Sequence, residues 1–526
     1  MRSIDRRSCL LSMLSVVPIT RILFAAAEPV VADTASGKVR GAAANGVNIF
    51  RGIPYAGPSE GPGRFMPPSK PEKWAGVRDA TVTGPQCVQQ GGNVFTSPLI
   101  GEYFAGGRPD RVELTKQPMS ENCLVLNVLT PAQTGKRPVM VYIHGGGFGT
   151  QSSLLTLFSD RHVREQDVVL VGINHRLNVF GYTYLGGLSE KFAVGNVGQL
   201  DLVAALQWVR DNIVNFGGDP KNVTVFGESG GGGKISALMG MPSAKGLFHK
   251  AIVQSGSVLR VGNAEAATKA AKAMMDKLNV SKPEDLQKVP AGDLFKAGLG
   301  REMGGGGPVV DGHSIPNQTW DPKAPAESAG VPLLVGNCKD ESTLFSRSNE
   351  TLFSLDEAAL KAALVKNGIP ADKVDPLLAL YHRDHPRESP SDLYFRISTD
   401  RGARRNAARQ AELRLAEGKT SVFVYYFQWN TPLDAGKLRA FHTSDLPLEM
   451  RLTLYPESEQ LSKQLSGAWG AFARTGDPSQ QHLPWPKYTL GQRSTMMFDV
   501  TESKALDDPD KDERVMLREL PSGGLL

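Results

Sequence analysis

The sequence predicts an α/β protein built on a central, mostly parallel sheet with helices on both faces. Short apolar runs recur along the 526 residues, and segments with helical spacing lie between them. Apolar runs of this length are typical of strands that are buried on both faces. The expected strands cover residues 139–143, 168–173, 223–226, 251–253, 331–335 and 422–427.

The segment 200–214 shows the helical pattern between two of these strands. Its apolar side chains fall on one broad face and are Leu200, Val203, Ala204, Leu206 and Trp208. The polar side chains that we expect to face mainly solvent are Asp201, Gln207, Arg210 and Asp211.

The chain is expected to form a single domain over residues 28–526, because no long repeat or low-complexity linker divides it. Segments at about 260–300 and 346–420 are more helical and more charged than the rest. We interpret them as insertions that pack over the sheet. No internal apolar run reaches the roughly 18 residues that a membrane-spanning helix needs.

The charge composition argues against a nucleic-acid partner. The net charge is +5, but residues 1–27 contribute +3 of it through four arginines and one aspartate, which leaves +2 for the remainder. A near-neutral body without a basic cluster offers no electrostatic reason to bind a polyanion.

Residues 1–27 are predicted to be an export signal peptide. Arg6 and Arg7 precede an apolar stretch, and Ala25-Ala26-Ala27 offers a small-residue cleavage site. The paired arginines are typical of a twin-arginine signal, although the residues around them fit that motif only in part. We therefore expect a protein that is exported to a bacterial periplasm or secreted. The alternative is a disordered cytosolic tail.

Three cysteines remain after such a cleavage. In an oxidising compartment Cys87 and Cys123 are the expected disulfide pair, which would close a loop of 35 intervening residues. Cys338 is then expected to be a buried free thiol.

The pentapeptide Gly227-Glu228-Ser229-Gly230-Gly231 is the most informative stretch of the chain. It has the pattern G-x-S-x-G, follows the expected strand 223–226 and precedes a helix-compatible segment, residues 230–239. This layout predicts a nucleophile elbow, a strained turn between strand and helix that presents the serine. Glycines flank the serine because side chains there would clash with the neighbouring elements.

A second glycine-rich stretch, His144-Gly145-Gly146-Gly147-Phe148, follows the expected strand 139–143. Consecutive glycines let backbone N–H groups turn toward one point, as acyl transfer requires for the anionic oxygen of its tetrahedral intermediate. The expected donors are Gly146 and Gly147, with the N–H of Gly230 as a third. Taken alone, the stretch has an alternative interpretation as a tight turn that needs glycine for packing.

Further motifs are dispersed between about residue 30 and about residue 500. They are Phe50-Arg51-Gly52-Ile53-Pro54, Ser120-Glu121-Asn122-Cys123-Leu124, Phe216-Gly217-Gly218-Asp219-Pro220 and Thr475-Gly476-Asp477-Pro478. Together with the elbow they resemble the type-B carboxylesterase family, the cholinesterase-like branch of the α/β-hydrolases. The resemblance implies an α/β-hydrolase fold with helical insertions over the active site, serine carboxylesterase activity, and an ion pair between Arg64 and Glu121.

The family has a triad in the chain order Ser, Glu, His. Residues 337–342 resemble its acid motif, which implies Glu341 as the acid, with Asp340 as the rival. Residues 440–447 resemble its histidine motif, which implies His442 as the base. Each residue follows an expected strand, so both would lie at the sheet edge that carries Ser229. The resemblance also implies that Glu228 and Ser255 join a buried hydrogen-bond network around the triad.

The chemistry implied by Ser229, Glu341 and His442 is ester hydrolysis through an acyl-enzyme, with water as the second acyl acceptor. No metal or organic cofactor is expected, since the chain has neither a Cys/His zinc spacing nor a P-loop sequence. His382 and His385 superficially match a kinase motif, but we interpret them as a solvated helix end.

Several positions depart from the family pattern. Gly230 replaces the usual alanine, and Lys234 stands where small or hydroxyl residues are common, so we expect a less constrained elbow. The loop between Cys87 and Cys123 contains no tryptophan, which argues against choline esters. The aromatic residues that remain for the pocket are Phe95, Tyr103 and Phe104.

Glycines 304–307 predict a roomy acyl pocket, which would accept long-chain or bulky esters as well as acetate esters. A specialised amide, carbamate or xenobiotic-ester hydrolase of the same family is an alternative. A non-catalytic, cholinesterase-like binding protein is the alternative from another class, and the presence of all the triad residues argues against it.

Overall fold

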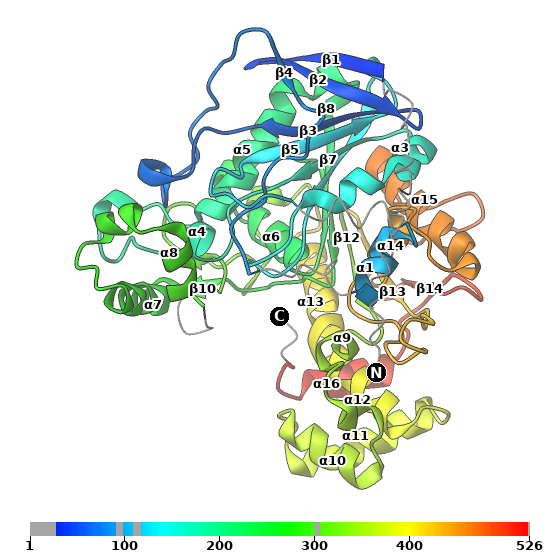
Figure 1. Ribbon diagram of the computed structural model, residues 1–526. Coiled ribbons are helices and arrows are strands. Elements are labelled where there is room, and N and C mark those ends of the chain that lie inside the picture. The colour runs from blue at the N-terminus through cyan, green and yellow to red at the C-terminus, as the bar shows by residue number, and fades with distance from the viewer. Residues whose placement is uncertain (1–27, 91–97, 109–116, 300–305, 524–526) are drawn as a thin grey trace, which may run out of the picture.

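The computed structural model describes residues 28–90, 98–108, 117–299 and 306–523. A thirteen-stranded sheet runs through the upper part of the molecule, and helices cover both of its faces (Figure 1). The expected export signal, residues 1–27, lies outside the described residues, as does Phe95.

All six strands expected from the apolar runs are present. They are β6 (Arg137–Ile143), β7 (Val169–Ile173), β8 (Gly218–Glu228), β9 (Lys250–Gln254), β12 (Leu333–Cys338) and β13 (Val422–Phe427). They pair in parallel in the order β7-β6-β8-β9-β12-β13. The predicted mostly parallel sheet is therefore confirmed.

The edges of the sheet contain strands that the sequence analysis did not predict. On one side lie β1 (Glu28–Thr34), β2 (Gly37–Ala44), β3 (Val47–Pro54), β4 (Val77–Asp79) and β5 (Val125–Thr130). On the other lie β14 (Thr495–Phe498) and β15 (Lys504–Leu506). The first of these edges is mostly antiparallel, and β2 alternates buried with exposed residues, so it shows no continuous apolar run.

Two apolar cores lie on opposite faces of the sheet, because successive side chains of a strand point to opposite sides. On β6, Val139, Val141 and Ile143 belong to one core, whereas Met140 and Tyr142 belong to the other. The helices that contribute to the first core include α5 (Val197–Asn212), α6 (Gly230–Leu238) and α13 (Arg405–Ala416). Those that contribute to the second include α3 (Asp160–Gln166) and α15 (Glu459–Thr475).

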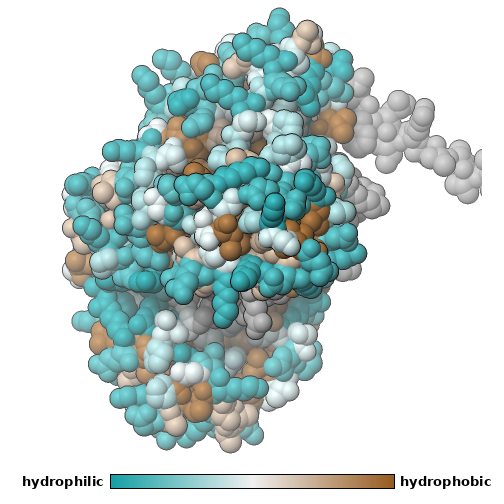
Figure 2. All heavy atoms as spheres, turned by 90° about the vertical axis from the view of Figure 1, so that its left-hand side faces the viewer, coloured by the Kyte–Doolittle hydropathy of each residue, from teal (hydrophilic) through white to brown (hydrophobic). Residues whose placement is uncertain are grey.

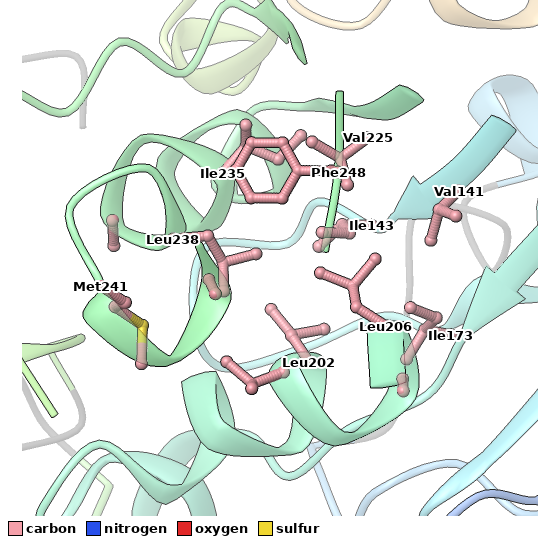
Figure 3. Close-up of a cluster of buried hydrophobic side chains, with 14 of the residues drawn as sticks. Val141, Ile143, Ile173, Leu202, Leu206, Val225, Ile235, Leu238, Met241 and Phe248 are labelled. Atoms are coloured by element: carbon pink, nitrogen blue, oxygen red, sulfur yellow. The ribbon is translucent and has the colours of Figure 1, made fainter. Parts of the chain in front are cut away.

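The first core holds the elbow helix against the sheet. In Figure 3, Leu206 of α5 lies beside Ile143 of β6, and Ile235 of α6 belongs to the same apolar cluster. Full burial of such an aliphatic side chain contributes about 1.5–3 kcal/mol. The position of α6 is thus fixed by apolar packing before any polar contact is considered.

One polar residue of α5 does not face solvent as predicted. Asp201 is fully buried, and its two carboxylate oxygens accept hydrogen bonds of 2.8 and 2.7 Å from Nε and Nη2 of buried Arg176. The helical period grouped Asp201 with the solvent-facing residues, because it cannot show that a buried cation from another segment pairs with this carboxylate. The expected pair of Arg64 and Glu121 is confirmed, with Nη2 2.6 Å from Oε1.

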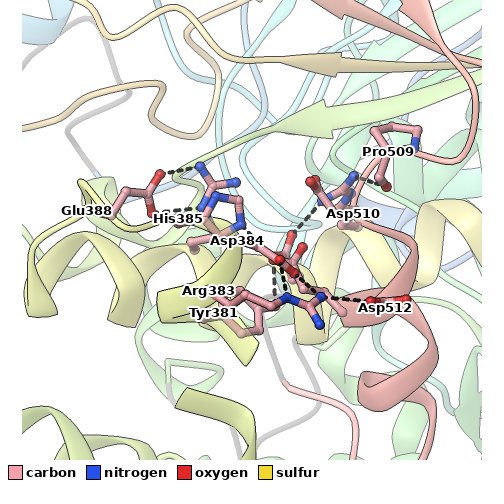
Figure 4. A network of polar contacts seen from close by, with 12 residues as sticks. Tyr381, Arg383, Asp384, His385, Glu388, Pro509, Asp510 and Asp512 are labelled. Atoms are coloured by element: carbon pink, nitrogen blue, oxygen red, sulfur yellow. Dashed lines mark hydrogen bonds and ion pairs between the residues drawn. The ribbon is translucent and has the colours of Figure 1, made fainter. Parts of the chain in front are cut away.

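The segment 346–420 and the C-terminal helix build a lobe at the bottom of Figure 1. Its helices are α10 (Glu357–Lys366), α11 (Ala371–Asp384), α12 (Pro390–Thr399) and α16 (Lys511–Arg518). They share an apolar cluster of their own, separate from the two sheet cores. Charged contacts also join α11 to α16: Nη2 of Arg383 lies 2.7 Å from Asp512, and Nε2 of His385 lies 2.7 Å from Glu513 (Figure 4).

The remaining helices connect the strands or lie near their ends. They are α1 (Pro98–Ala105), α4 (Asn178–Tyr182), α7 (Ala264–Lys277), α8 (Ala291–Ala297), α9 (Ser342–Ser346) and α14 (Leu446–Glu449). On the face in Figure 2, hydrophobic residues are scattered among hydrophilic ones. Among the helices of the described residues, none combines the length and apolar character needed to cross a membrane.

Candidate active site

Ser229 occupies the turn between β8 and α6, as the pentapeptide predicts. Its backbone has φ 57° and ψ −125°, a conformation that residues other than glycine rarely adopt. The N–H of Ser229 donates to the carbonyl of Gln254 in the neighbouring strand β9, at 2.8 Å. The strained turn is therefore held by the sheet, and it presents the serine at the carboxyl end of β8.

Gly230 brings the glycine-rich loop onto the elbow. A Cβ atom added at Gly230 would lie only 2.1 Å from the carbonyl oxygen of Gly147, and one added at Gly231 would lie 2.1 Å from that of Ile143. The prediction of a less constrained elbow is therefore wrong. The missing alanine side chain does not loosen the turn, because the backbone of Gly147 fills the place that the side chain would take.

The glycine-rich loop has the backbone that its sequence suggests. Gly146 and Gly147 adopt φ values of 75° and 60°, which favour glycine. The loop lies close to the serine, since a Cβ added at Gly145 would come within 3.4 Å of the Cβ of Ser229. The loop that carries the expected donors Gly146 and Gly147 therefore lies beside the nucleophile candidate and against Gly230.

Glu341 and His442 lie side by side, because an isolated parallel bridge joins their chain neighbours Asp340 and Phe441. Nδ1 of His442 contacts Oε2 of Glu341. The other carboxylate oxygen, Oε1, accepts a hydrogen bond of 2.6 Å from the hydroxyl of Ser255. The carboxylate is therefore fixed on both sides, and the expected contact of Ser255 with the acid is present.

Asp340 serves a different purpose from its neighbour. Its carboxylate lies 3.2 Å from Nζ of Lys339, and its Oδ2 accepts from the backbone N–H of Ala440 at 3.3 Å. It thus supports the chain segment that carries the histidine. Of the two adjacent carboxylates, only that of Glu341 contacts the imidazole in the described hydrogen bonds.

The other ring nitrogen, Nε2 of His442, lies 3.2 Å from Oε1 of Glu228, the residue that precedes the serine. It makes no hydrogen bond to any described residue. Burial lowers the pKa of His442, but the carboxylates of Glu228 and Glu341 outweigh burial and raise this pKa to about 9. Burial also raises the pKa of Glu228 well above its usual range.

A layer of buried polar groups lies next to the triad candidates, and of its members only Asp445 was expected from the sequence to be a structural carboxylate near the site. Its members are Gln254, Tyr425, Asp445 and Glu449. The Gln254 side chain donates to Glu449 at 2.6 Å, and the Tyr425 hydroxyl donates to Asp445 at 2.7 Å. Burial raises the pKa of both Asp445 and Glu449. No spacing in the sequence marks the other three residues, since they come from β9, β13 and α14.

Aromatic residues near the histidine differ from those expected. Phe345 of α9 stacks on His442 with ring centroids 4.9 Å apart, although 57% of its surface is exposed. Tyr103 is instead fully buried, and its hydroxyl donates to the carbonyl of Ser444. Phe104 lines a small cavity of about 10 Å³ that also borders Glu228.

The expected acyl-side glycines fall partly within the described residues. Gly306 has open space where a side chain would stand, whereas a Cβ at Gly307 would meet the ring of Phe148 at 2.9 Å. Residues 304 and 305 lie outside the described residues.

The expected disulfide is not formed in the structure. Cys87, Cys123 and Cys338 are all buried free thiols. The first two are nevertheless neighbours, since a hydrogen bond from Cys87 is the largest cause that raises the pKa of Cys123, ahead of burial. The pairing inferred from sequence correctly identified the neighbouring thiols, but their sulfur atoms are not bonded here.

The described residues contain one group of ligand-type atoms within 4.8 Å of one another, formed by His385, Asp510 and Glu513. It lies at the junction of α11 with α16, and Nη1 of Arg404 already lies 2.7 Å from Asp510. A guanidinium at this distance competes with any cation for the carboxylate.

The mostly parallel sheet carries Ser229 at a strained turn after β8, Glu341 after β12 and His442 after β13. This arrangement defines an α/β hydrolase. Comparison with known proteins agrees. The model of the carboxylesterase family matches residues 28–517. The para-nitrobenzyl esterase of Bacillus subtilis is 36% identical over 518 residues, which cover 94% of this chain and 99% of the relative.

Two solved structures are similar to this chain in fold as well as in sequence. A carboxylesterase of Geobacillus stearothermophilus has a TM-score of 0.77 at 33% identity, covering 93% of this chain and 99% of that one. An esterase of Clostridium hathewayi, described as able to hydrolyse aliphatic aromatic polyesters, has a TM-score of 0.76 at 30% identity, covering 94% and 100%. This chain belongs to the carboxylesterase family and is a carboxylic ester hydrolase.

Proposed function

We propose that this hydrolase cleaves its esters with Ser229 as nucleophile, His442 as general base and Glu341 as the acid that orients the imidazole. The contact between Nδ1 of His442 and Glu341 carries the proposal, because it leaves Nε2 as the only ring nitrogen free to take a proton. The position of Ser229 also supports the pairing, because Nε2 of His442 lies 3.2 Å from Oε1 of Glu228, the residue that precedes the serine.

The reaction proceeds in two acyl transfers. His442 removes the hydroxyl proton as the Ser229 oxygen attacks the carbonyl carbon, and the carbonyl oxygen becomes an anion that the N–H groups of Gly146, Gly147 and Gly230 stabilise. The tetrahedral intermediate collapses, His442 returns the proton to the departing alcohol, and an acyl-enzyme remains. Water then attacks in the same way and releases the acid.

The substrates are esters with a long or bulky acyl part as well as acetate esters. The open space at Gly306 supports this breadth. Among the relatives, one is named a para-nitrobenzyl esterase and another is described as able to hydrolyse aliphatic aromatic polyesters. A specialised hydrolase for amides, carbamates or xenobiotic esters is the second candidate, supported by a relative named phenmedipham hydrolase that is 30% identical.

The protein acts outside the cytoplasm, in a bacterial periplasm or after secretion. The paired Arg6 and Arg7 before an apolar stretch support export. In that compartment Cys87 and Cys123 form a disulfide, for which the contact between their thiols supplies the proximity. Mass spectrometry of protein isolated from the periplasm, with and without reductant, tests this pairing by a difference of two hydrogen masses.

Hydrolysis of a nitrophenyl ester tests the catalytic assignment. The wild type is expected to release nitrophenol with kinetics that Ser229→Ala abolishes. Glu341→Gln should lower kcat by several orders of magnitude, whereas Asp340→Asn, its neighbour in the chain, should retain most of the activity. Equal rates for the wild type and Ser229→Ala, or a larger loss in Asp340→Asn than in Glu341→Gln, would reject the assignment.

A further inference from the structure

Lys234 is a fully buried cation on the elbow helix. It lies on α6, five residues after Ser229, and none of its surface is exposed. Its Nζ donates to the carbonyl oxygens of His144 at 2.8 Å and of Gly145 at 3.3 Å. The ring of Phe148 lies 5.8 Å from Nζ. The contacts of this ammonium with the described residues are therefore with the glycine-rich loop.

A buried ammonium is normally paired with a carboxylate, because burial without a counter-ion is costly. No Asp or Glu oxygen of the described residues lies within 4.0 Å of Nζ of Lys234. Burial accordingly lowers the pKa of Lys234 to about 7. The charge also lowers the pKa of the stacked rings of His144 and His175, after burial as the larger cause. A core position that served packing alone would not need a charged group.

The geometry of the peptide bond connects Lys234 to the anion site. A trans peptide unit is planar, and its C=O and N–H point in opposite directions. The carbonyl of Gly145 and the N–H of Gly146 belong to one such unit. A donor that holds this carbonyl on the side of α6 therefore turns the N–H of Gly146 to the other side, and a cation at the carbonyl also polarises the N–H into a stronger donor.

Gly230 makes this contact possible. Since the loop backbone at Gly147 stands where a side chain of residue 230 would be, the loop can approach α6 closely enough for Lys234 to reach it. Gly230 and Lys234 are the two departures from the family pattern in this helix. The structure shows that they meet the same loop from two successive turns of α6.

We propose that Lys234 is a positioning residue of the anion site, which fixes and polarises the peptide units of the loop so that the N–H of Gly146 points at the tetrahedral intermediate. The inference rests on the proposed function, because it assigns Lys234 to the anion site of that reaction. Because the N–H groups of the loop bind the developing anion more strongly than the ground-state carbonyl, Lys234 acts on kcat more than on KM.

A matched pair of ligands tests this role. A trifluoromethyl ketone accepts the Ser229 oxygen at its carbonyl carbon, the serine proton moves to His442, and the ketone oxygen becomes the anion. The methyl ketone of the same skeleton binds without forming that anion. Lys234→Met is expected to weaken the binding of the trifluoromethyl ketone by about 10- to 100-fold, as for loss of part of an anion site. The affinity for the methyl ketone and the KM for an ester should stay within about threefold of the wild-type values.

Lys250→Met is the control, because Lys250 is also buried but lies on β9 beside Asn222, away from the loop. Lys250→Met should leave the affinity for both ketones unchanged. Should Lys234→Met fail to fold, Lys234→Gln carries the same comparison. The proposal is overturned if Lys234→Met loses affinity for both ketones equally, or if its affinity for neither ketone changes. A wild type that binds the two ketones equally would instead reject the proposed function itself.

Discussion

Gly230→Ala is predicted to damage catalysis in this chain, although alanine is the usual residue at this position in the family. The added Cβ would stand 2.1 Å from the carbonyl oxygen of Gly147, whereas real Cβ contacts are essentially never closer than 3.0 Å. The loop or α6 must therefore move by at least about 0.9 Å. Both carry expected anion donors, so the movement separates groups that must converge on one atom.

The size of the effect follows from that displacement. A misplacement of about 1 Å at a reacting group can cost about 100-fold in rate, so we expect kcat for a nitrophenyl ester to fall by about that factor. Gly292→Ala is the control, since Gly292 lies on the exposed face of α8 with open space around it. It should gain about 0.5–1 kcal/mol of stability and keep full activity. A Gly230→Ala enzyme with kcat within threefold of the wild type would refute this reasoning.

Three further predictions concern buried charges. Asp201→Asn leaves a buried guanidinium without its carboxylate and should lower the free energy of unfolding by about 3–5 kcal/mol in urea denaturation. Glu228→Gln removes the carboxylate 3.2 Å from Nε2 of His442, so the pKa of that imidazole falls. The neutral base then forms at lower pH, and the acidic limb of the kcat/KM profile should move to lower pH. Ser255→Ala removes a hydrogen bond to the Glu341 carboxylate and should lower kcat by about 10-fold in the same ester assay.

Each of these has a clear contrary result. An unfolding free energy of Asp201→Asn within about 1 kcal/mol of the wild type would show that the buried pair does not stabilise the fold. An acidic limb that stays in place or moves to higher pH in Glu228→Gln would show that Glu228 does not raise the pKa of the base. Unchanged kcat in Ser255→Ala would show that Glu341 is held by other contacts alone.

The sequence predicted the central sheet because its strands are buried on both faces and therefore appear as continuous apolar runs. The mostly antiparallel edge formed by β1 to β5 escaped prediction, because a strand covered on one face alternates polar and apolar residues over a short length. The burial of Asp201 could not be predicted for another reason. Its partner Arg176 is 25 residues away, and nothing local marks the pair.

At the site, short motifs predicted the residues whose backbone or order is distinctive. Ser229 and the glycines were recognisable because the turn needs them, and the neighbouring positions of Glu341 and His442 followed from their places after parallel strands. The effect of Gly230 and Lys234 on the packing of the elbow was misjudged from sequence. Both depend on a contact between α6 and a loop about 90 residues earlier in the chain, which no local pattern records.

Trapping the acyl-enzyme tests the central claim most directly. The wild type is mixed with a nitrophenyl ester, quenched in acid within the first turnover, and digested for mass spectrometry. We predict one acyl group per molecule, attached to the peptide that contains Ser229, and none in Ser229→Ala. Nitrophenol release without any acylated peptide, or an acyl group on another residue that persists in Ser229→Ala, would contradict the account.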